Sequence, residues 1–147
     1  MLVIFDWDGT LVDSAGKIVR CLAAASADCG VPILSFDEYK HIIGLGLPEA
    51  FAMLYPNESD AVRENLRLAY AEHFIGDSSA TQMFDGVAQG LQALQQQGYR
   101  LAVATGKSRR GMNRVLDELD MHHLFEITRC ADETRSKPHP LMLAEIL

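Results

Sequence analysis

Basic residues are scarce in this 147-residue chain, and it has no long hydrophobic run. Thirteen Lys and Arg residues stand against twenty Asp and Glu residues, which gives a formal net charge of −7. A general nucleic-acid-binding protein would present a basic surface, so this balance argues against that class. No segment approaches the roughly 20 apolar residues that a transmembrane helix needs, and we expect no membrane partner.

Cysteine is sparse as well. Cys21, Cys29 and Cys130 are odd in number and lack the spacing of a disulfide framework, which indicates free thiols in a reducing compartment. The first residues have no basic segment before their short apolar run, which argues against a secretory signal peptide. These features predict a soluble cytoplasmic protein, and the 48% of hydrophobic residues is enough for a core.

The most informative segment is residues 2–10, Leu-Val-Ile-Phe-Asp-Trp-Asp-Gly-Thr. Its four apolar residues predict a short strand that is buried on both faces. Asp6 and Asp8 follow at a spacing of two, which points both carboxylates to the same side of an extended chain. Two adjacent anions repel, so such a pair indicates a cation, a shared proton or a catalytic task. An ordinary turn at Asp8 and Gly9 is the alternative interpretation.

The rest of the hydrophobic pattern separates a helical block from an alternating region. Apolar residues at helical spacing and capping signals predict helices at residues 14–29, 35–43, 48–55 and 59–74. From residue 85 onward, helices are expected at 87–97 and 108–119 and after residue 140, with strands at 101–104 and 125–130. This alternation predicts an α/β fold, a Rossmann-like parallel sheet with right-handed crossovers. We expect that core to comprise residues 1–13 and 77–147, with residues 14–76 inserted after the first strand.

Polar residues also follow the second and third strands. Thr105 and Gly106 offer a hydroxyl and a backbone N–H to an anion, although a helix N-cap at Thr105 or Ser108 is an alternative. Lys137 precedes a proline before the last helix, where it can meet a phosphate or a carboxylate, although a lone lysine is usually a solvated charge. The Gly-Lys-Ser run at 106–108 lacks the earlier glycine of a P-loop, so we reject a nucleotide-binding loop.

In this order, the residues resemble the haloacid dehalogenase superfamily over nearly the whole chain. The matching segments are Asp6-Trp7-Asp8-Gly9-Thr10-Leu11-Val12-Asp13-Ser14, Thr105-Gly106 and Lys137-Pro138. The resemblance implies that the inserted block at residues 14–76 is a helical cap. It also implies that Asp6 is a nucleophile that forms an aspartyl-phosphate and that Asp8 is the general acid and base.

The same resemblance implies a magnesium site and a phosphate site. The Asp6 side chain and the backbone carbonyl of Asp8 would be the protein ligands of Mg²⁺. Thr105, Gly106 and Lys137 would hold the remaining phosphate oxygens. A carboxylate at position 8 favours a phosphate substrate, because the dehalogenases lack one there. We therefore expect a Mg²⁺-dependent phosphatase for a small phosphorylated metabolite, most like the phosphoglycolate phosphatases.

Two alternatives to this function stay open. The first is a phosphoglucomutase-like phosphoryl transfer on the same scaffold, which would isomerise a sugar phosphate and release no free phosphate. The second is a non-catalytic interaction module or a decayed enzyme.

The chain departs from the family pattern after Lys137. A fourth motif, a strand that ends in Gly-Asp and completes the metal site, is not found there, and Gly76-Asp77 comes too early. We therefore expect a truncated form with three strands in the order 3-2-1, weak Mg²⁺ binding and little or no activity. The first strand would be an exposed apolar edge and a candidate homodimer interface.

Three further groups of residues are weaker candidates. The histidines at 122–123 and His139 have no carboxylate or cysteine cluster beside them, which argues against a transition-metal site. Gly44-Leu45-Gly46 fits equally a plain helix–helix turn and a loop that faces a substrate. Arg109 and Arg110 are expected on a solvated helix face.

Overall fold

The structure is a computed structural model that describes all 147 residues. The chain divides into two compact units, which we name the sheet unit and the helical unit. The sheet unit contains Met1–Asp13, Gly44–Gly46 and Thr81–Leu147, and the helical unit contains Ser14–Ile43 and Leu47–Ala80. Relative to the expected boundaries, residues 77–80 group with the helices and Gly44–Gly46 groups with the sheet.

A parallel sheet of three strands forms the centre of the sheet unit. The strands are β1 (Leu2–Phe5), β2 (Arg100–Thr105) and β3 (Ile127–Cys130), in the order β1-β2-β3. The helices of this unit are α5 (Val87–Gln96), α6 (Arg109–Leu119) and α7 (Leu141–Ile146), with a 3₁₀ turn, η1, at His122–Leu124. The expected Rossmann-like α/β fold and its 3-2-1 strand order are confirmed.

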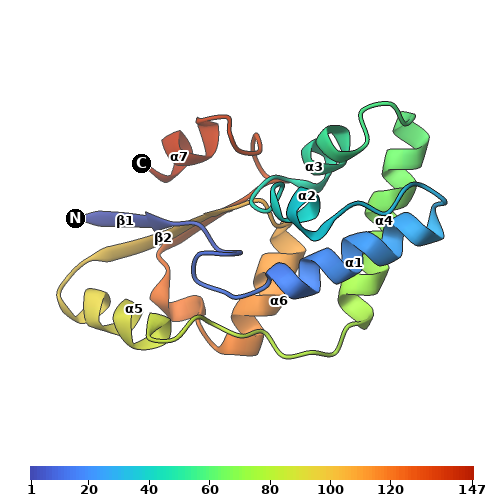
Figure 1. The fold of residues 1–147 in the computed structure, drawn as a ribbon. Helices are drawn as coiled ribbons and strands as arrows, with labels where there is room; N and C mark the ends of the chain where they lie inside the picture. The colour runs from blue at the N-terminus through green and yellow to red at the C-terminus, as the bar shows by residue number, and fades with distance from the viewer. The chain divides into compact units, whose positions relative to one another are not determined.

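Helices cover both faces of this sheet (Figure 1). On one face, α5 and α6 pack over the sheet, and the cluster there includes Val3, Phe5, Leu91, Leu101, Val103, Met112, Val115 and Leu116. On the other face, α7 packs through Met142 and Ile146 onto Ala102 and Ala104, with Leu2, Ile4 and Ile127 beside them. Alternate residues of each strand therefore enter different cores, as the two-residue repeat of a strand requires.

The expectation that the first strand is buried on both faces is wrong. All four residues of β1 are half-buried, whereas β2 is buried from Leu101 to Thr105. The reason is the strand order, because β2 has a neighbour on each side and β1 pairs with β2 alone. An apolar sequence therefore gave a half-buried edge strand, and pairing of this edge with a second copy stays a prediction.

A tight turn built on Trp7 ends β1. The Trp7 side chain is fully buried and meets the Phe125 ring edge-on, with 6.0 Å between the centroids. Its carbonyl accepts hydrogen bonds from the N–H groups of Thr10, Leu11 and Val12. The core thus fixes the residue between Asp6 and Asp8, which holds the two carboxylates at the end of the strand.

The chain leaves and re-enters the sheet unit along paired segments. Val12 forms an antiparallel bridge with Met83, and the Asp13 N–H donates to the Gln82 carbonyl at 2.8 Å. The Phe84 N–H donates to the Leu11 carbonyl at 3.1 Å. Backbone hydrogen bonds therefore join the segment that leaves the sheet unit to the segment that returns to it.

The helical unit contains four helices. They are α1 (Ala15–Asp28), α2 (Phe36–Lys40), α3 (Leu47–Leu54) and α4 (Asp60–Gly76). A capping box is present, because Ser35 and Glu38 exchange hydrogen bonds at the start of α2. Helix α2 ends at Lys40, three residues before the expected position, and turns lead on to the Gly44–Gly46 loop.

Three buried hydroxyl groups join the helices of this unit. The Tyr55 hydroxyl lies 2.8 Å from Ser26 Oγ and 2.9 Å from the Tyr39 hydroxyl, and it donates to the Pro32 carbonyl at 2.7 Å. The Leu34 N–H donates to the Tyr39 hydroxyl at 3.0 Å. This network satisfies its buried polar atoms and fixes the chain between α1 and α2.

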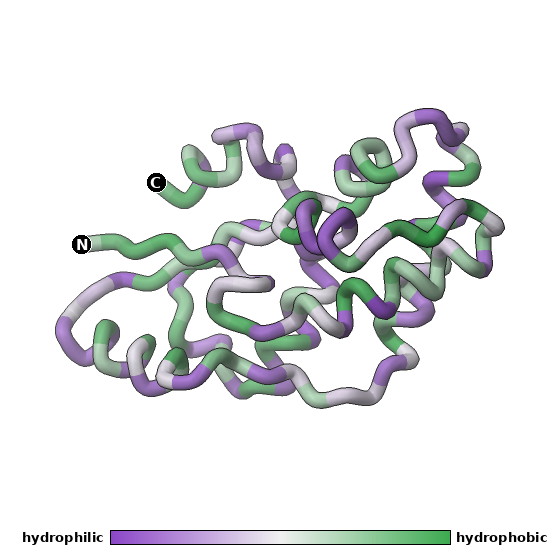
Figure 2. The backbone as a smooth tube through the Cα atoms, in the orientation of Figure 1, coloured by the Kyte–Doolittle hydropathy of each residue, from purple (hydrophilic) through white to green (hydrophobic).

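Apolar residues occur in short stretches along the chain (Figure 2), and none of the helices is both long enough and apolar enough to span a lipid bilayer. All three cysteines are free thiols, as expected, and two of them are buried. The cytoplasmic location stays a prediction.

Candidate active site

Asp6 and Lys137 meet at the carboxyl ends of the strands, although 131 positions separate them. Lys137 Nζ lies 2.7 Å from Asp6 Oδ1 and donates a second hydrogen bond to the Ala104 carbonyl of β2 at 3.2 Å. The other Asp6 oxygen accepts a hydrogen bond from the Thr10 hydroxyl at 3.3 Å. Lys137 therefore does not have the geometry of a solvated surface charge, because its ammonium group binds a carboxylate and a strand-end carbonyl.

Asp8 has a different lysine as its partner. Lys107 Nζ lies 3.7 Å from Asp8 Oδ2, and the two side chains are only 13% and 11% exposed. Lys107 follows β2, whereas Lys137 follows β3. No role is predicted for Lys107 from the sequence, where it stands only in the rejected P-loop run. Its position two residues beyond the end of a buried strand is the signal that could have identified it.

Thr105 ends β2 with its side chain 1% exposed. Its hydroxyl oxygen accepts a hydrogen bond from the Lys107 N–H at 3.1 Å, which tightens the turn after the strand. Of the two N-cap alternatives for α6, Ser108 is the one present, because its hydroxyl accepts from the Gly111 N–H. The Thr105 hydroxyl is therefore part of the strand-end turn, beside the residue whose side chain reaches Asp8.

Gly106 faces the Gly44–Gly46 loop at close range. A Cβ atom on Gly106 would lie 2.4 Å from the Leu45 carbonyl oxygen and 2.6 Å from the Gly44 carbonyl oxygen, so only glycine fits. The Gly46 N–H donates to Ser136 Oγ at 2.8 Å, and a Cβ on Gly44 would lie 4.0 Å from Lys137 Nζ. The loop thus lies against the segments that carry Gly106 and Lys137, which is more than a plain helix–helix turn requires.

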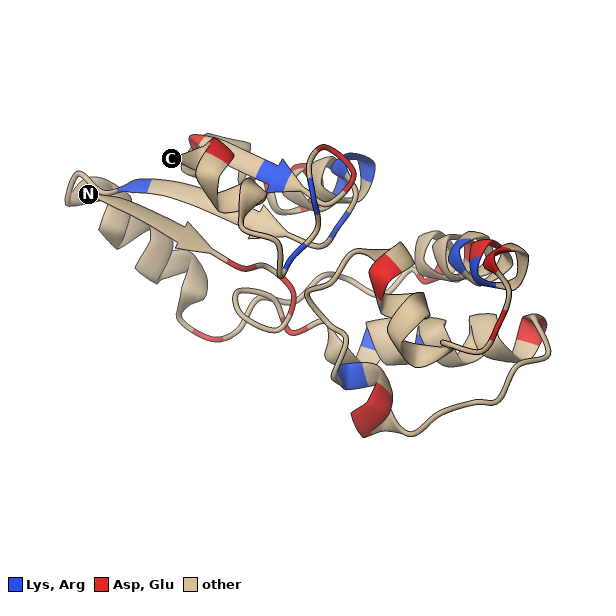
Figure 3. Ribbon diagram, turned by 90° about the horizontal axis from the view of Figure 1, so that it is seen from above, with Lys and Arg blue, Asp and Glu red and all other residues tan.

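The acidic and basic side chains of this edge lie in two pairs. Figure 3 shows acidic and basic segments meeting where β1 ends, and two ion pairs, Asp6 with Lys137 and Asp8 with Lys107, lie there. A phosphate dianion would therefore bring negative charge that these four groups leave uncompensated. A divalent cation would offset that charge, and a carboxylate is the hard oxygen donor that Mg²⁺ prefers.

The residues at this edge suit a Mg²⁺ ion that takes most of its ligands from water and phosphate. They do not form a cage of protein ligands around a metal. No group of three or more His, Cys, Asp or Glu side chains is placed to hold a metal ion. Mg²⁺ commonly uses one or two carboxylates and takes its other ligands from water and substrate phosphates. The Asp6 carboxylate suits that pattern, and the histidines at 122–123 and His139 form no metal cluster.

Comparison with known proteins identifies the family. The family model described as Haloacid dehalogenase-like hydrolase matches residues 3–147. This chain belongs to that family. It is 35% identical over 147 residues to Probable phosphatase IndB of Dickeya dadantii (strain 3937), which covers 96% of this chain and 64% of that protein. It is 30% identical over 155 residues to Phosphoglycolate phosphatase of Aliivibrio fischeri (strain ATCC 700601 / ES114), which covers 99% of this chain and 68% of that protein.

The fold of this haloacid dehalogenase-like chain also matches solved structures. A haloacid dehalogenase-like protein from Bacteroides fragilis superposes with a TM-score of 0.87 at 27% identity, over 99% of this chain and 70% of that one. The chain thus spans 64–70% of the length of these three relatives. The resemblance expected from the sequence is confirmed, while the roles of individual residues stay predictions.

Arg110 is exposed on α6, as expected, whereas the expectation of a solvated helix face is wrong for Arg109. Its guanidinium binds both Glu133 oxygens, at 2.7 and 3.1 Å, and it donates to the Thr128 carbonyl at 2.6 Å. Hydrogen bonds from Arg109 hold the pKa of Glu133 below its ordinary value of 4.5. Arg109 therefore fastens the start of α6 to β3 and to the turn that follows it.

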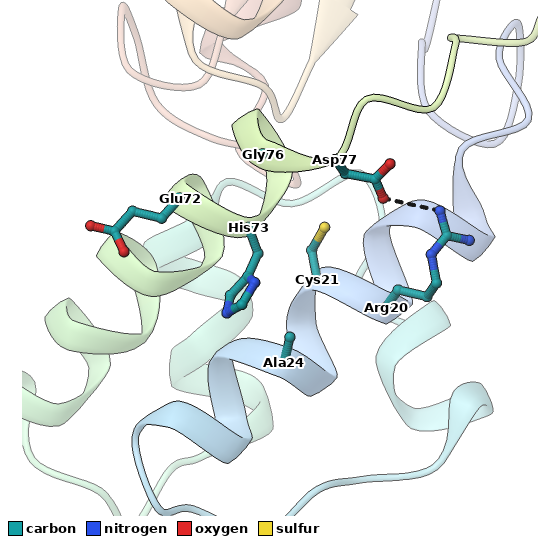
Figure 4. A pocket seen from close by; sticks show the side chains of 7 residues that line it. All are labelled: Arg20, Cys21, Ala24, Glu72, His73, Gly76 and Asp77. Carbon is teal, nitrogen blue, oxygen red and sulfur yellow. Dashed lines mark hydrogen bonds and ion pairs between the residues drawn. The ribbon is translucent and has the colours of Figure 1, made fainter.

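A pocket of about 360 Å³ lies within the helical unit, and none of the predicted site residues lines it (Figure 4). Its lining residues are Arg20, Cys21, Ala24, Glu72, His73, Gly76 and Asp77. Arg20 pairs with Asp77 at 3.1 Å, and His73 pairs with Asp28. Burial raises the pKa of the Cys21 thiol, which disfavours a reactive thiolate. The polar groups of this pocket thus hold α1 and α4 together.

Proposed function

We propose that the protein is a Mg²⁺-dependent phosphatase that hydrolyses a small phosphorylated metabolite, in the manner of a phosphoglycolate phosphatase. The observation that carries this proposal is the Asp6–Lys137 pair, a carboxylate at a strand end held 2.7 Å from an ammonium group. Such a pair presents a nucleophile and a cation to the same phosphate. The names of the relatives from Dickeya dadantii and Aliivibrio fischeri support a phosphatase.

In the first proposed step, an Asp6 carboxylate oxygen attacks the phosphorus of the substrate. The bond between phosphorus and the ester oxygen breaks, and its electron pair stays on the leaving oxygen. Asp8 donates a proton to that oxygen, so the alcohol leaves neutral and Asp6 carries the phosphoryl group. The Trp7 anchor supports this division of roles, because it fixes the residue between the two carboxylates.

In the second proposed step, water attacks the phosphorus of the aspartyl-phosphate. Asp8 takes a proton from that water, the bond between phosphorus and the Asp6 oxygen breaks, and inorganic phosphate leaves. Asp6 returns as a carboxylate and Asp8 returns protonated, so both residues are ready for another turnover. Positioning and charge stabilisation supply most of the catalysis in phosphoryl transfer.

The Asp6 side chain and the Asp8 backbone carbonyl would be the protein ligands of Mg²⁺. The bound ion would supply positive charge that offsets the repulsion between the phosphate and the two carboxylates. Lys137, the Thr105 hydroxyl and the Gly106 N–H would hold the remaining phosphate oxygens. This assignment is supported by the position of Lys137 on Asp6 and by the place of Thr105 and Gly106 at the end of β2.

A substrate screen tests the proposal. The longest natural chain that carries this sequence is assayed for phosphate release from phosphorylated metabolites, including 2-phosphoglycolate, with Mg²⁺ and after EDTA treatment. We expect turnover that EDTA abolishes and that Asp6→Asn removes. Acid quenching and peptide mapping should locate a phosphoryl group on the Asp6 peptide.

Two results would contradict the proposal. Phosphate release that survives Asp6→Asn would remove Asp6 as nucleophile. Isomerisation of a sugar phosphate that depends on a bisphosphate, without release of free phosphate, would favour the mutase alternative.

A further inference from the structure

Lys107 is the charged residue of this edge for which the proposed function has no role. Its ammonium group lies 3.7 Å from Asp8 Oδ2, and the side chains of Lys107 and Asp8 are 13% and 11% exposed. The Thr105 hydroxyl holds the backbone of Lys107 from one side, since it accepts the Lys107 N–H at 3.1 Å. From the other side, the Ala131 N–H donates to the Lys107 carbonyl at 2.9 Å. Lys107 is therefore anchored to the segments after β2 and β3.

The two lysines of this edge divide the two carboxylates between them. The Lys137 ammonium group donates hydrogen bonds to Asp6, the proposed nucleophile, and to the Ala104 carbonyl. Lys107 reaches the other carboxylate from a different strand end. A cation on each carboxylate lowers the repulsion between Asp6 and Asp8 and gives each a separate place. Because only 11% of the Asp8 side chain is exposed, its rotation into solvent is also restricted.

We propose that Lys107 is a positioning residue for Asp8, which aims its carboxyl group at the leaving oxygen of the phosphate ester. The inference rests on the proposed function, because it deepens the acid and base role of Asp8. The effect of this positioning depends on the leaving group of the substrate. Lys107 should matter most for substrates whose leaving oxygen needs a proton and little for those whose leaving group is stable as an anion.

A comparison of leaving groups tests this. In the longest natural chain that carries this sequence, Lys107→Met is assayed on an alkyl phosphate, 2-phosphoglycolate, and on an aryl phosphate, p-nitrophenyl phosphate. The quantity measured is kcat/KM, which covers the steps up to phosphoryl transfer to Asp6. We expect a loss of about 10- to 100-fold on the alkyl phosphate and less than about 3-fold on the aryl phosphate, since a misplaced general acid costs rates of this order.

The ratio of the two kcat/KM values protects the test against partial misfolding, because both values scale with the same concentration of folded enzyme. Arg110→Met is the matched control, since it removes an exposed cation at the start of α6, three residues beyond Lys107. That control should leave the ratio unchanged. A double variant, Asp8→Asn with Lys107→Met, should lose no more than Asp8→Asn alone, because Lys107 acts through Asp8.

Each contrary outcome has a distinct meaning. Equal losses on both substrates, or an added loss in the Asp8→Asn background, would overturn the positioning role. Unchanged kcat/KM values on both substrates in Lys107→Met would remove any role of Lys107 in aiming Asp8. If the unaltered protein released no phosphate from either substrate or from the wider screen, the proposed function and this inference would both fail.

Discussion

Lys137 Nζ lies 2.7 Å from Asp6 Oδ1, so two residues from opposite ends of the sheet unit's sequence form one charged pair. Lys137 also binds the last-but-one carbonyl of β2, that of Ala104. The pair therefore ties the ends of β1 and β2 to the segment after β3. It combines a structural bond with the charge arrangement that the proposed reaction needs.

Replacement of Lys137 by methionine tests that charge. The methionine side chain keeps much of the length of lysine but lacks the ammonium group, so Asp6 loses its partner and the phosphate loses a cation. We expect kcat/KM to fall by at least about 100-fold, the order found when one charge-stabilising group is removed. Lys40→Met, at an exposed position of α2, is the control and should retain full activity. Full activity in Lys137→Met would contradict the assignment.

Substitution of Gly106 by alanine tests the contact with the Gly44–Gly46 loop. The new Cβ would meet two backbone carbonyl oxygens, at 2.4 and 2.6 Å, and backbone cannot rotate away as a side chain can. We expect the free energy of unfolding to fall by about 1–3 kcal/mol, as for other overpacked sites. Urea denaturation followed by circular dichroism measures it.

Gly90→Ala provides the matched control, because Gly90 lies inside α5 and a Cβ there has no neighbour within 4 Å. Alanine at such a helical position should raise the free energy of unfolding by about 0.5–1 kcal/mol. Equal effects of the two substitutions would show that the loop does not lie against Gly106.

The Arg109–Glu133 pair predicts a dependence of stability on pH. Arg109 lowers the pKa of Glu133 below 4.5 in the folded chain, so the unfolded chain binds more protons as the solution becomes acidic. The stabilisation is therefore complete above pH 4.5 and is lost as the pH falls through the folded pKa. Glu133→Gln should lose less free energy of unfolding than the unaltered protein between about pH 6 and about pH 3. Identical losses would show that this pair contributes nothing.

Removal of the Tyr55 hydroxyl tests the network in the helical unit. Tyr55→Phe would leave the Pro32 carbonyl without its 2.7 Å donor and would remove one partner each from Ser26 and Tyr39. We expect a loss of about 1–3 kcal/mol in the free energy of unfolding, because three hydrogen bonds are lost and a typical one contributes about 0.5–1.5 kcal/mol. Tyr99→Phe, at a half-buried position in the sheet unit, should lower the free energy of unfolding by less. Thermal or urea denaturation of both variants measures the difference.

The sequence could predict the fold and the pairing of Asp6 with Lys137, because parallel strands bring their carboxyl ends to one edge of a sheet. It could not predict the contact between Lys107 and Asp8, which depends on the course of the turn after β2 and on two rotamers. Arg109 is a similar case, since its partner Glu133 lies 24 positions away. Local patterns also cannot report neighbours, so the apolar run of β1 taken alone predicted burial on both faces, and its place at the edge followed only from the expected strand order.

The Gly44–Gly46 loop shows the same limit at the level of units. Its flanking helices α2 and α3 belong to the helical unit, and every local signal places the loop with them. The loop bonds to Ser136 and packs on Gly106, and these residues lie about 60 to 90 positions further along the sequence. These contacts place the loop in the sheet unit.

The bridge between Val12 and Met83 makes the helical unit an exchangeable module. Because the chain departs and returns on adjacent, hydrogen-bonded segments, a short turn from Asp13 to Gln82 would close the gap without moving β1 or α5. Recombination in evolution can therefore replace the inserted segment with one of another length or fold. Asp6 and Lys137 would keep their places through such an exchange, while the contact of Gly106 with the loop would be rebuilt each time.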